Sequence, residues 1–335
     1  MLNGMTISIT PEPSPQLDSL DVKVETNYQQ WLAMDMRKCE LNHNIRKALL
    51  LVSGKFSYQR QKGLDQLLEL ISKITMNQQD VTIFSLLHRK LSPESNVILS
   101  IVNNILKGKS EAQHNLSPIR IQEVKKSLAV IEGACLLSPY CSSALATVQG
   151  GKIIVKILSE CGAAFSQSET TSNPLLDSLS TPSATIVTQT SHNIDILWEE
   201  IRIMAIDTLE ASLHNCISSA ISFCEDSCPD MIIEMVRNKH LSQKLRSKCV
   251  EIVCLLFQLM CVAEKRRENE TVLLKTLSER IEVFLGLNLT EELIETALKP
   301  IESRTAGVQI SLEVVQLQDM TFYDQFVKRV DQRFL

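Results

Sequence analysis

The chain has 335 residues, of which 44% are hydrophobic and 22% are charged, a balance typical of a globular protein with a large buried core. Its net charge of −5 argues against a protein that binds nucleic acid over its whole surface, because phosphate contacts need clustered Lys and Arg. Ten Gly and ten Pro are too few for the many turns of an all-β fold. We therefore expect an all-α protein.

The N-terminal segment shows no helical pattern. Residues 1–26 are polar and punctuated by Pro and Ser, which predicts a disordered leader. They lack the basic region and apolar run of a secretory signal. Most of the ten cysteines lie in apolar stretches, as buried free thiols do. We expect an intracellular protein, cytoplasmic or nuclear, with no membrane span.

A helical domain is predicted over residues 27–306, because apolar residues there recur every three or four positions. One stripe comprises Leu64, Leu67, Leu68, Ile71 and Ile74. Another comprises Ile201, Met204, Ala205, Thr208 and Leu209. Polar segments at 107–118 and 166–193, the second rich in Ser and Thr, are predicted to be flexible loops within this domain.

The C-terminal part carries three further signals. Thr290 followed by Glu291 predicts a helix start, and Pro300 predicts the end of that helix. Residues 307–318 partly alternate like a strand. A final helix is predicted in the tail, residues 307–335, with one face formed by Phe322, Phe326 and Val330. This tail either docks on the preceding helices, which we favour, or is a linear motif read by a partner.

Two segments of the domain share one arrangement. Residues 124–161 and 198–236 each contain a long apolar helix, a break, a short helix, a Gly or Pro stop and another apolar helix. After Ser138-Pro139, the pair Gly150-Gly151 is followed by Ile153, Ile154, Ile157 and Leu158. This pattern resembles the armadillo repeat family, whose units, like HEAT units, run about 40–47 residues. The long third helices would contain Ala129, Ala205 and Cys249. The resemblance is clearest at 124–161 and 198–262, and it implies a right-handed helical-repeat solenoid with a concave surface.

The resemblance also suggests binding residues. Armadillo proteins that hold extended peptides commonly place an Asn at a fixed step of each third helix, and only Asn104 matches here. The step four residues earlier carries three acids among five positions. We therefore predict a groove that attracts a basic or amphipathic partner segment. Its residues are Asp65, Glu69, Asn104, Asp207 and Glu251. The alternative is that these acids simply mark solvated helix faces.

A basic stretch provides a second candidate surface. Residues 237–248 hold five Lys or Arg and no acid, and 265–267 add three more. Together they could bind phosphate backbones, acidic partners or the nuclear import machinery. A solvated linker is the favoured alternative, and no aromatic residues lie among them for base stacking. The predicted basic patch comprises Arg237, Lys239, Lys244, Arg246, Lys248, Lys265, Arg266 and Arg267.

The sequence carries no recognised signature of a catalytic, cofactor or metal site. The sequence has no phosphate loop, no nucleophile elbow and no zinc-protease motif. Cys224 and Cys228, with His214 and His240 nearby, offer one close ligand pair where a zinc site usually has two, so we expect structural cysteines. We expect no catalytic residues, no cofactor and no metal. The leading hypothesis is a non-enzymatic scaffold or adaptor that binds protein partners through its concave helical surface. The alternative is a chromatin- or nucleic-acid-associated subunit of a genome-maintenance complex that uses the basic patch.

Overall fold

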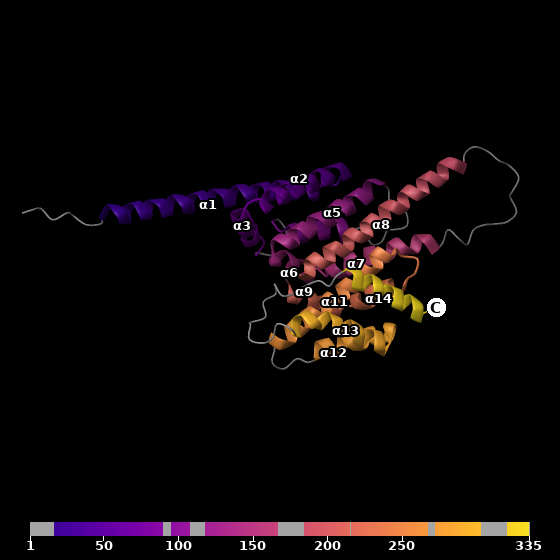
Figure 1. Ribbon diagram of the computed structural model, residues 1–335. Coiled ribbons are helices and arrows are strands. Elements are labelled where there is room, and N and C mark those ends of the chain that lie inside the picture. The colour runs from indigo at the N-terminus through magenta and orange to yellow at the C-terminus, as the bar shows by residue number, and fades with distance from the viewer. Residues whose placement is uncertain are drawn as a thin grey trace, which may run out of the picture. The chain divides into compact units, whose positions relative to one another are not determined.

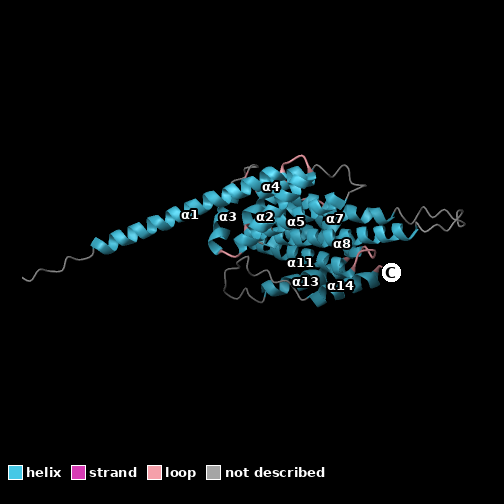
Figure 2. Ribbon diagram, turned by 90° about the horizontal axis from the view of Figure 1, so that it is seen from above, coloured by secondary structure: helices cyan, strands magenta, loops and turns pink. Residues whose placement is uncertain are grey.

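The computed structural model (Figure 1) describes residues 17–89, 95–107, 118–166, 184–214, 216–266, 272–302 and 320–334. Every regular element within these ranges is a helix, as Figure 2 shows, and this confirms the all-α prediction. The chain divides into two units, residues 1–43 and 44–335. The strand predicted at 307–318 lies outside the described residues. No helix in the described ranges is long and apolar enough to cross a membrane.

The helices follow one another in the order α1 (Leu17–Val52), α2 (Ser57–Thr75), α3 (Gln78–His88), α4 (Val97–Ile101), the π-helix η1 (Val102–Leu106), α5 (Pro118–Leu137), α6 (Pro139–Thr147), α7 (Gly150–Ser166), α8 (Ala184–His214), α9 (Ile217–Glu225), α10 (Cys228–Arg237), α11 (Gln243–Arg266), α12 (Val272–Leu285), α13 (Leu287–Glu302) and α14 (Met320–Arg333).

Two helices begin earlier than the sequence pattern predicted. Helix α1 includes residues 17–26, which were assigned to the leader, and α8 includes 184–193, which were assigned to a loop. Both segments lead without a break into the rest of their helices. Once a helix has formed, each added residue gains a backbone hydrogen bond without a new nucleation cost, so a helix extends into sequence with little periodicity of its own.

In the first unit, the helical residues 28–40 of α1 are all exposed. Tyr28 and Trp31 stack on each other there, with ring centroids 6.4 Å apart. Arg37 forms an ion pair with Glu40 at 2.8 Å along the same helix. These contacts are all local, between residues three positions apart on one helix.

The long helices of the second unit form a row, in which α2 packs against α5, α5 against α8, and α8 against α11 (Figure 1). The row continues from α11 to α13. The shorter helices form a second row, α3 with α6 and α6 with α9, and a third, α7 with α10 and α10 with α12. Each row therefore joins helices that are separated in the chain by other helices.

The predicted apolar stripes face these helix contacts. On α2, four of the five stripe residues are buried and Leu68 is half-buried. On α8, four of the five are buried and Met204 is half-buried. The hydroxyl of Thr208 donates to the carbonyl oxygen of Met204 at 2.7 Å and lies 3.2 Å from that of Leu128 on α5. A polar residue is thus accommodated inside the α5–α8 contact because its hydroxyl is hydrogen-bonded.

Glycine allows one particularly close helix contact. A Cβ atom at Gly63 of α2 would lie 2.7 Å from the carbonyl oxygen of Ala48 and 2.8 Å from the amide nitrogen of Val52. Both of these are backbone atoms in the last turns of α1, within the second unit. Backbone atoms cannot rotate away as a side chain can, so only Gly fits this crossing.

Helix α14 docks on α11 and α10, which is the favoured alternative for the tail. Its buried face comprises Tyr323, Phe326, Val327 and Val330, each at most 1% exposed, and the predicted Phe322 is half-buried beside them. The guanidinium of Arg246 donates to both carboxylate oxygens of Asp331, at 2.7 and 3.0 Å. It also donates to the carbonyl oxygen of Val236 at 2.7 Å. The final helix therefore completes the core of the second unit.

Two predicted helix boundaries are wrong. Helix α13 begins at Leu287, directly after Gly286, whose φ of +77° makes the turn from α12. Thr290 is therefore inside the helix, where its hydroxyl donates to the carbonyl oxygen of Gly286 at 3.0 Å. Pro300 does not end the helix, which continues to Glu302. A left-handed Gly is a stronger start signal here than a capping hydroxyl, and a proline this close to the end interrupts only the last turn.

Candidate functional site

Four acidic side chains from three neighbouring helices surround one lysine. Glu132 comes from α5, Asp207 and Glu210 come from α8, and Lys248 and Glu251 come from α11. The ammonium group of Lys248 contacts a carboxylate oxygen of Asp207 at 2.6 Å. We call these five residues the acidic cluster.

Helical spacing and helix packing together build the acidic cluster. Asp207 and Glu210 are three residues apart, as are Lys248 and Glu251, so each pair shares one face of its helix. Because α8 lies between α5 and α11 in the row of long helices, these faces meet beside the buried stripes. The cluster therefore sits at the edge of the core and not on a fully solvated surface.

A recess of about 330 Å³ opens on this cluster. Three of its acids line it, together with Leu136, Ala211 and His214. Leu136 is 58% exposed, so the recess has an apolar side as well as an acidic one. Recesses of roughly 300–1,000 Å³ are large enough to enclose a small ligand or a long side chain.

Burial shifts the protonation of the cluster. Glu251 is only 5% exposed, and burial, reinforced by Glu210 and Asp207, raises its pKa to about 7, while Lys248 opposes the shift. Burial and the neighbouring carboxylates also raise the pKa of Glu132. The pKa of Glu210 is raised as well, chiefly by burial. These shifts have one cause, which is that ionised carboxylates are close together and poorly solvated.

Lys248 compensates only part of this negative charge. Burial lowers its pKa, but the hydrogen bond and charge of Asp207, with the charges of Glu210 and Glu251, outweigh burial and raise the pKa above its ordinary value. With every group ionised, four carboxylates face one ammonium group, which leaves three negative charges uncompensated. The cluster would therefore accept further positive charge.

The arrangement of the carboxylates limits which kind of positively charged group the cluster could bind. Within the described part of the chain, no group of three or more His, Cys, Asp or Glu is arranged to hold a metal ion. Three of the four carboxylates instead line an open recess. Such an arrangement suits the long side chain of a lysine or arginine, whose aliphatic stem can lie on Leu136.

The structure brings together only two of the five predicted groove residues, Asp207 and Glu251. Asp65 is exposed on α2, where it pairs with Lys126 of α5 at 2.7 Å. Glu69 is exposed and pairs with Lys73 one turn along the same helix, at 2.6 Å. Asn104 is exposed, and its amide donates to the hydroxyl of Ser100 at 3.2 Å.

Sequence reasoning missed Glu132, Glu210 and Lys248 as members of the site. Glu210 could have been found, because it lies three residues after Asp207 on the same helix face. Lys248 was instead assigned to the basic patch. Its pairing with Asp207, 41 residues earlier in the chain, depends on how α8 and α11 pack.

The basic patch is largely occupied by contacts within the protein. Arg246 is bound to Asp331 and has a side chain only 5% exposed, and Lys248 belongs to the acidic cluster. The guanidinium of Arg237 lies over the ring of Phe334, 4.4 Å from its centroid. Two further members, Lys239 and Lys244, are exposed. The side chains of Lys265 and Arg266, and all of Arg267, lie outside the described residues.

Cys224 and Cys228 lie at the junction between α9 and α10. Burial raises the pKa of each thiol to about 12, which keeps both protonated at neutral pH. Arg280 of α12 donates to the carbonyl oxygens of Cys224 and Asp226 and to the carboxylate of Asp230. The local network therefore joins α12 to α9 and α10 through Arg280.

Comparison of the chain with protein-family models, with curated proteins and with solved structures gave no match.

Proposed function

We propose that this protein is a non-enzymatic scaffold that binds a basic segment of a partner protein at the acidic cluster. The observation that carries this proposal is the meeting of four carboxylates and a single lysine on three adjacent long helices, beside an open recess. A lysine or arginine side chain of the partner would supply the missing positive charge. It would also form charge-assisted hydrogen bonds, which are stronger than neutral ones.

The order of the helices supports an armadillo- or HEAT-like solenoid as the scaffold. Three successive groups each end in a long helix: α3 with α4, η1 and α5; α6 with α7 and α8; α9 with α10 and α11. Equivalent helices pack on each other, α3 on α6 and α6 on α9, α5 on α8 and α8 on α11. Stacking of equivalent helices is how repeat proteins build a continuous binding surface. In this arrangement the acidic cluster lies on the row of long helices.

The cost of the cluster to stability also supports a binding role. An ionised Glu251 is held in a place where only 5% of the residue is exposed, and its pKa of about 7 means that folding opposes this charge. A neutral side chain of similar size would be more favourable for folding alone. Side chains that reduce stability in this way are commonly retained where they serve function.

The test uses two acids of the recess that are half-buried. Glu132→Gln/Glu210→Gln removes two negative charges with little change in shape. The matched control, Glu69→Gln/Glu279→Gln, removes two charges from exposed acids elsewhere, each in a pair with a lysine one turn away. Affinity purification from native lysate is followed by identification of the bound proteins. We expect partners to be lost from the recess variant and retained by the control.

Two outcomes would redirect the proposal. Partners retained equally by both variants would remove the acidic cluster as the binding site. Partners lost only after nuclease treatment would support the nucleic-acid-associated alternative, in which the exposed lysines near 239–244 contact phosphates.

A further inference from the structure

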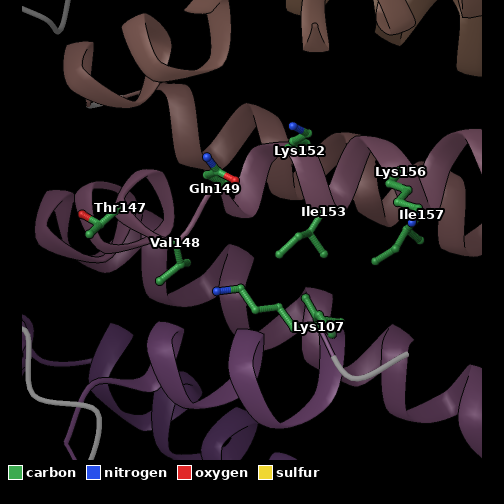
Figure 3. A pocket seen from close by; sticks show the side chains of 9 residues that line it. Lys107, Thr147, Val148, Gln149, Lys152, Ile153, Lys156 and Ile157 are labelled. Carbon is green, nitrogen blue, oxygen red and sulfur yellow. The ribbon is translucent and has the colours of Figure 1, made fainter. Parts of the chain in front are cut away.

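A second recess, of about 420 Å³, lies where the end of η1 meets the corner between α6 and α7 and the first turns of α7 (Figure 3). It combines an apolar lining with a lysine rim. The apolar side chains are Leu106, Val148, Ile153 and Ile157, and the polar ones are Lys107, Thr147, Gln149, Lys152 and Lys156. None of these described lining residues is acidic. We call this recess the lysine groove.

Helix α7 has more apolar surface than its packing uses. Ile154, Val155 and Leu158 are buried in the core. Ile153 and Ile157, four residues apart, are half-buried and line the groove instead. A helix that packs with one face normally carries polar residues on the remaining faces. Within the described ranges, the packing of α7 therefore leaves this second apolar stripe only partly covered.

The lysines are distributed along the groove and do not converge. Figure 3 shows the side chain of Lys107 extending toward the Val148 end and Lys156 at the Ile157 end. The amine of Lys152 points away from Ile153 and Ile157 in the same view. All three lysines are exposed. A single phosphate needs converging donors, whereas separated amines suit several acidic groups spaced along one segment.

The backbone on both sides of the groove departs from regular geometry. On one side η1 is a π-helix that ends at Leu106, and such elements occur frequently at functional sites. On the other side Gln149 has a φ of +54°, a left-handed conformation that is unfavourable for a residue with a side chain. Leu106, the last residue of η1, and Gln149 both line the groove.

We propose that the lysine groove docks an acidic, amphipathic segment of a partner protein. Its carboxylates pair with Lys107 and Lys156 at the two ends, and its apolar side chains cover Ile153 and Ile157. A protein segment fits better than nucleic acid, because the described lining residues include aliphatic side chains but no aromatic ring for base stacking. This surface is separate from the acidic cluster and opposite in charge.

The experiment measures binding of a fluorescent synthetic peptide of about 12 residues, in which Glu and Asp alternate with pairs of Leu, to the full chain by fluorescence anisotropy at about 50 mM salt. The groove variant is Lys107→Glu/Lys156→Glu. The matched control is Lys73→Glu/Lys275→Glu, at two lysines whose side chains are 68% and 77% exposed on other helices. We expect the groove variant to bind at least about tenfold more weakly and the control less than about twofold.

Three results would overturn the proposal. The first is a wild-type chain that does not bind the peptide. The second is an equal loss of peptide binding in the groove variant and the control, when circular dichroism shows that both are folded. The third is equal binding of polyglutamate or of a DNA duplex, which would indicate a general polyanion surface without use of the apolar floor. The Glu132→Gln/Glu210→Gln chain is expected to bind the acidic peptide like wild type, so this proposal and the proposed function fail separately.

Discussion

Replacing Glu251 by Gln removes the most buried charge of the acidic cluster and nearly preserves the shape of the side chain. The pKa of Glu251 is raised from 4.5 to about 7 by burial and by the charges of Glu210 and Asp207. The folded state therefore binds more protons than the unfolded state between these two values. The folded protein is therefore most stable with respect to this group below pH 4.5, where Glu251 is protonated in both states. This stability is lost as the pH rises through 7 and Glu251 ionises in the folded state.

The size of this effect follows from the two pKa values. A carboxyl that titrates at about 7 when folded and 4.5 when unfolded makes the wild-type chain less stable by about 3 kcal/mol at pH 8 and about 1 kcal/mol at pH 5. The amide of Gln does not titrate. We therefore expect Glu251→Gln to raise the free energy of unfolding by about these amounts at the two pH values.

Urea unfolding followed by circular dichroism at pH 5 and pH 8 measures both values by linear extrapolation. All groups other than Glu251 are common to the two chains, so their own titration largely cancels in the difference. Glu279→Gln, at an exposed glutamate on α12, is the control and should show no such pH dependence. The reasoning is refuted if Glu251→Gln changes stability equally at both pH values or destabilises the protein at pH 8.

The affinity of the wild-type chain for a lysine-rich peptide should rise between pH 5 and pH 8 in titration calorimetry, because bound positive charge favours the ionised form of Glu251. Constant affinity would argue against binding at the acidic cluster. Gly63→Ala should lower the stability measured by urea unfolding by about 1–3 kcal/mol, because its Cβ would meet backbone atoms of α1 at 2.7 and 2.8 Å. Asp331→Asn should cost about 1–2 kcal/mol and increase amide exchange in α14, since it leaves the buried guanidinium of Arg246 without its carboxylate. Unchanged exchange would mean that apolar packing alone holds this helix. His88, whose pKa is lowered to about 4 by burial, should destabilise the fold by up to about 3 kcal/mol as the pH falls from 6.5 to 4, and His88→Gln should flatten that limb of the stability curve.

The helices could be predicted from the sequence because their signal is local. Apolar residues spaced by three and four positions identified the buried faces of α2 and α8, and the aromatic positions near 322–330 identified α14. The ends of the helices were harder to predict from the sequence. The φ of +77° at Gly286 sets the start of α13, and no residue between Thr290 and Pro300 indicates that start. The early starts of α1 and α8 likewise reflect helix propagation and not periodicity.

The candidate site could be predicted only in part. The sequence placed acids at regular steps of the long helices, and two of them, Asp207 and Glu251, do meet. The alternative, that these acids mark solvated helix faces, does not describe Glu251, which is buried. Lys248, predicted in the basic patch, instead pairs with Asp207. The lysine groove had no sequence signal, because η1 and α7 are separated in the chain by α5 and α6.

By itself, then, the sequence of this protein determined that it is helical and which face of most helices is apolar. The tertiary structure alone decided which charges meet, how deeply Glu251 is buried and where the two recesses open. The physical reason is that a 3.6-residue period specifies the faces of one helix from neighbouring residues. Charge interactions and burial depend instead on distances between helices that are far apart in the chain, and these are set only when the helices pack.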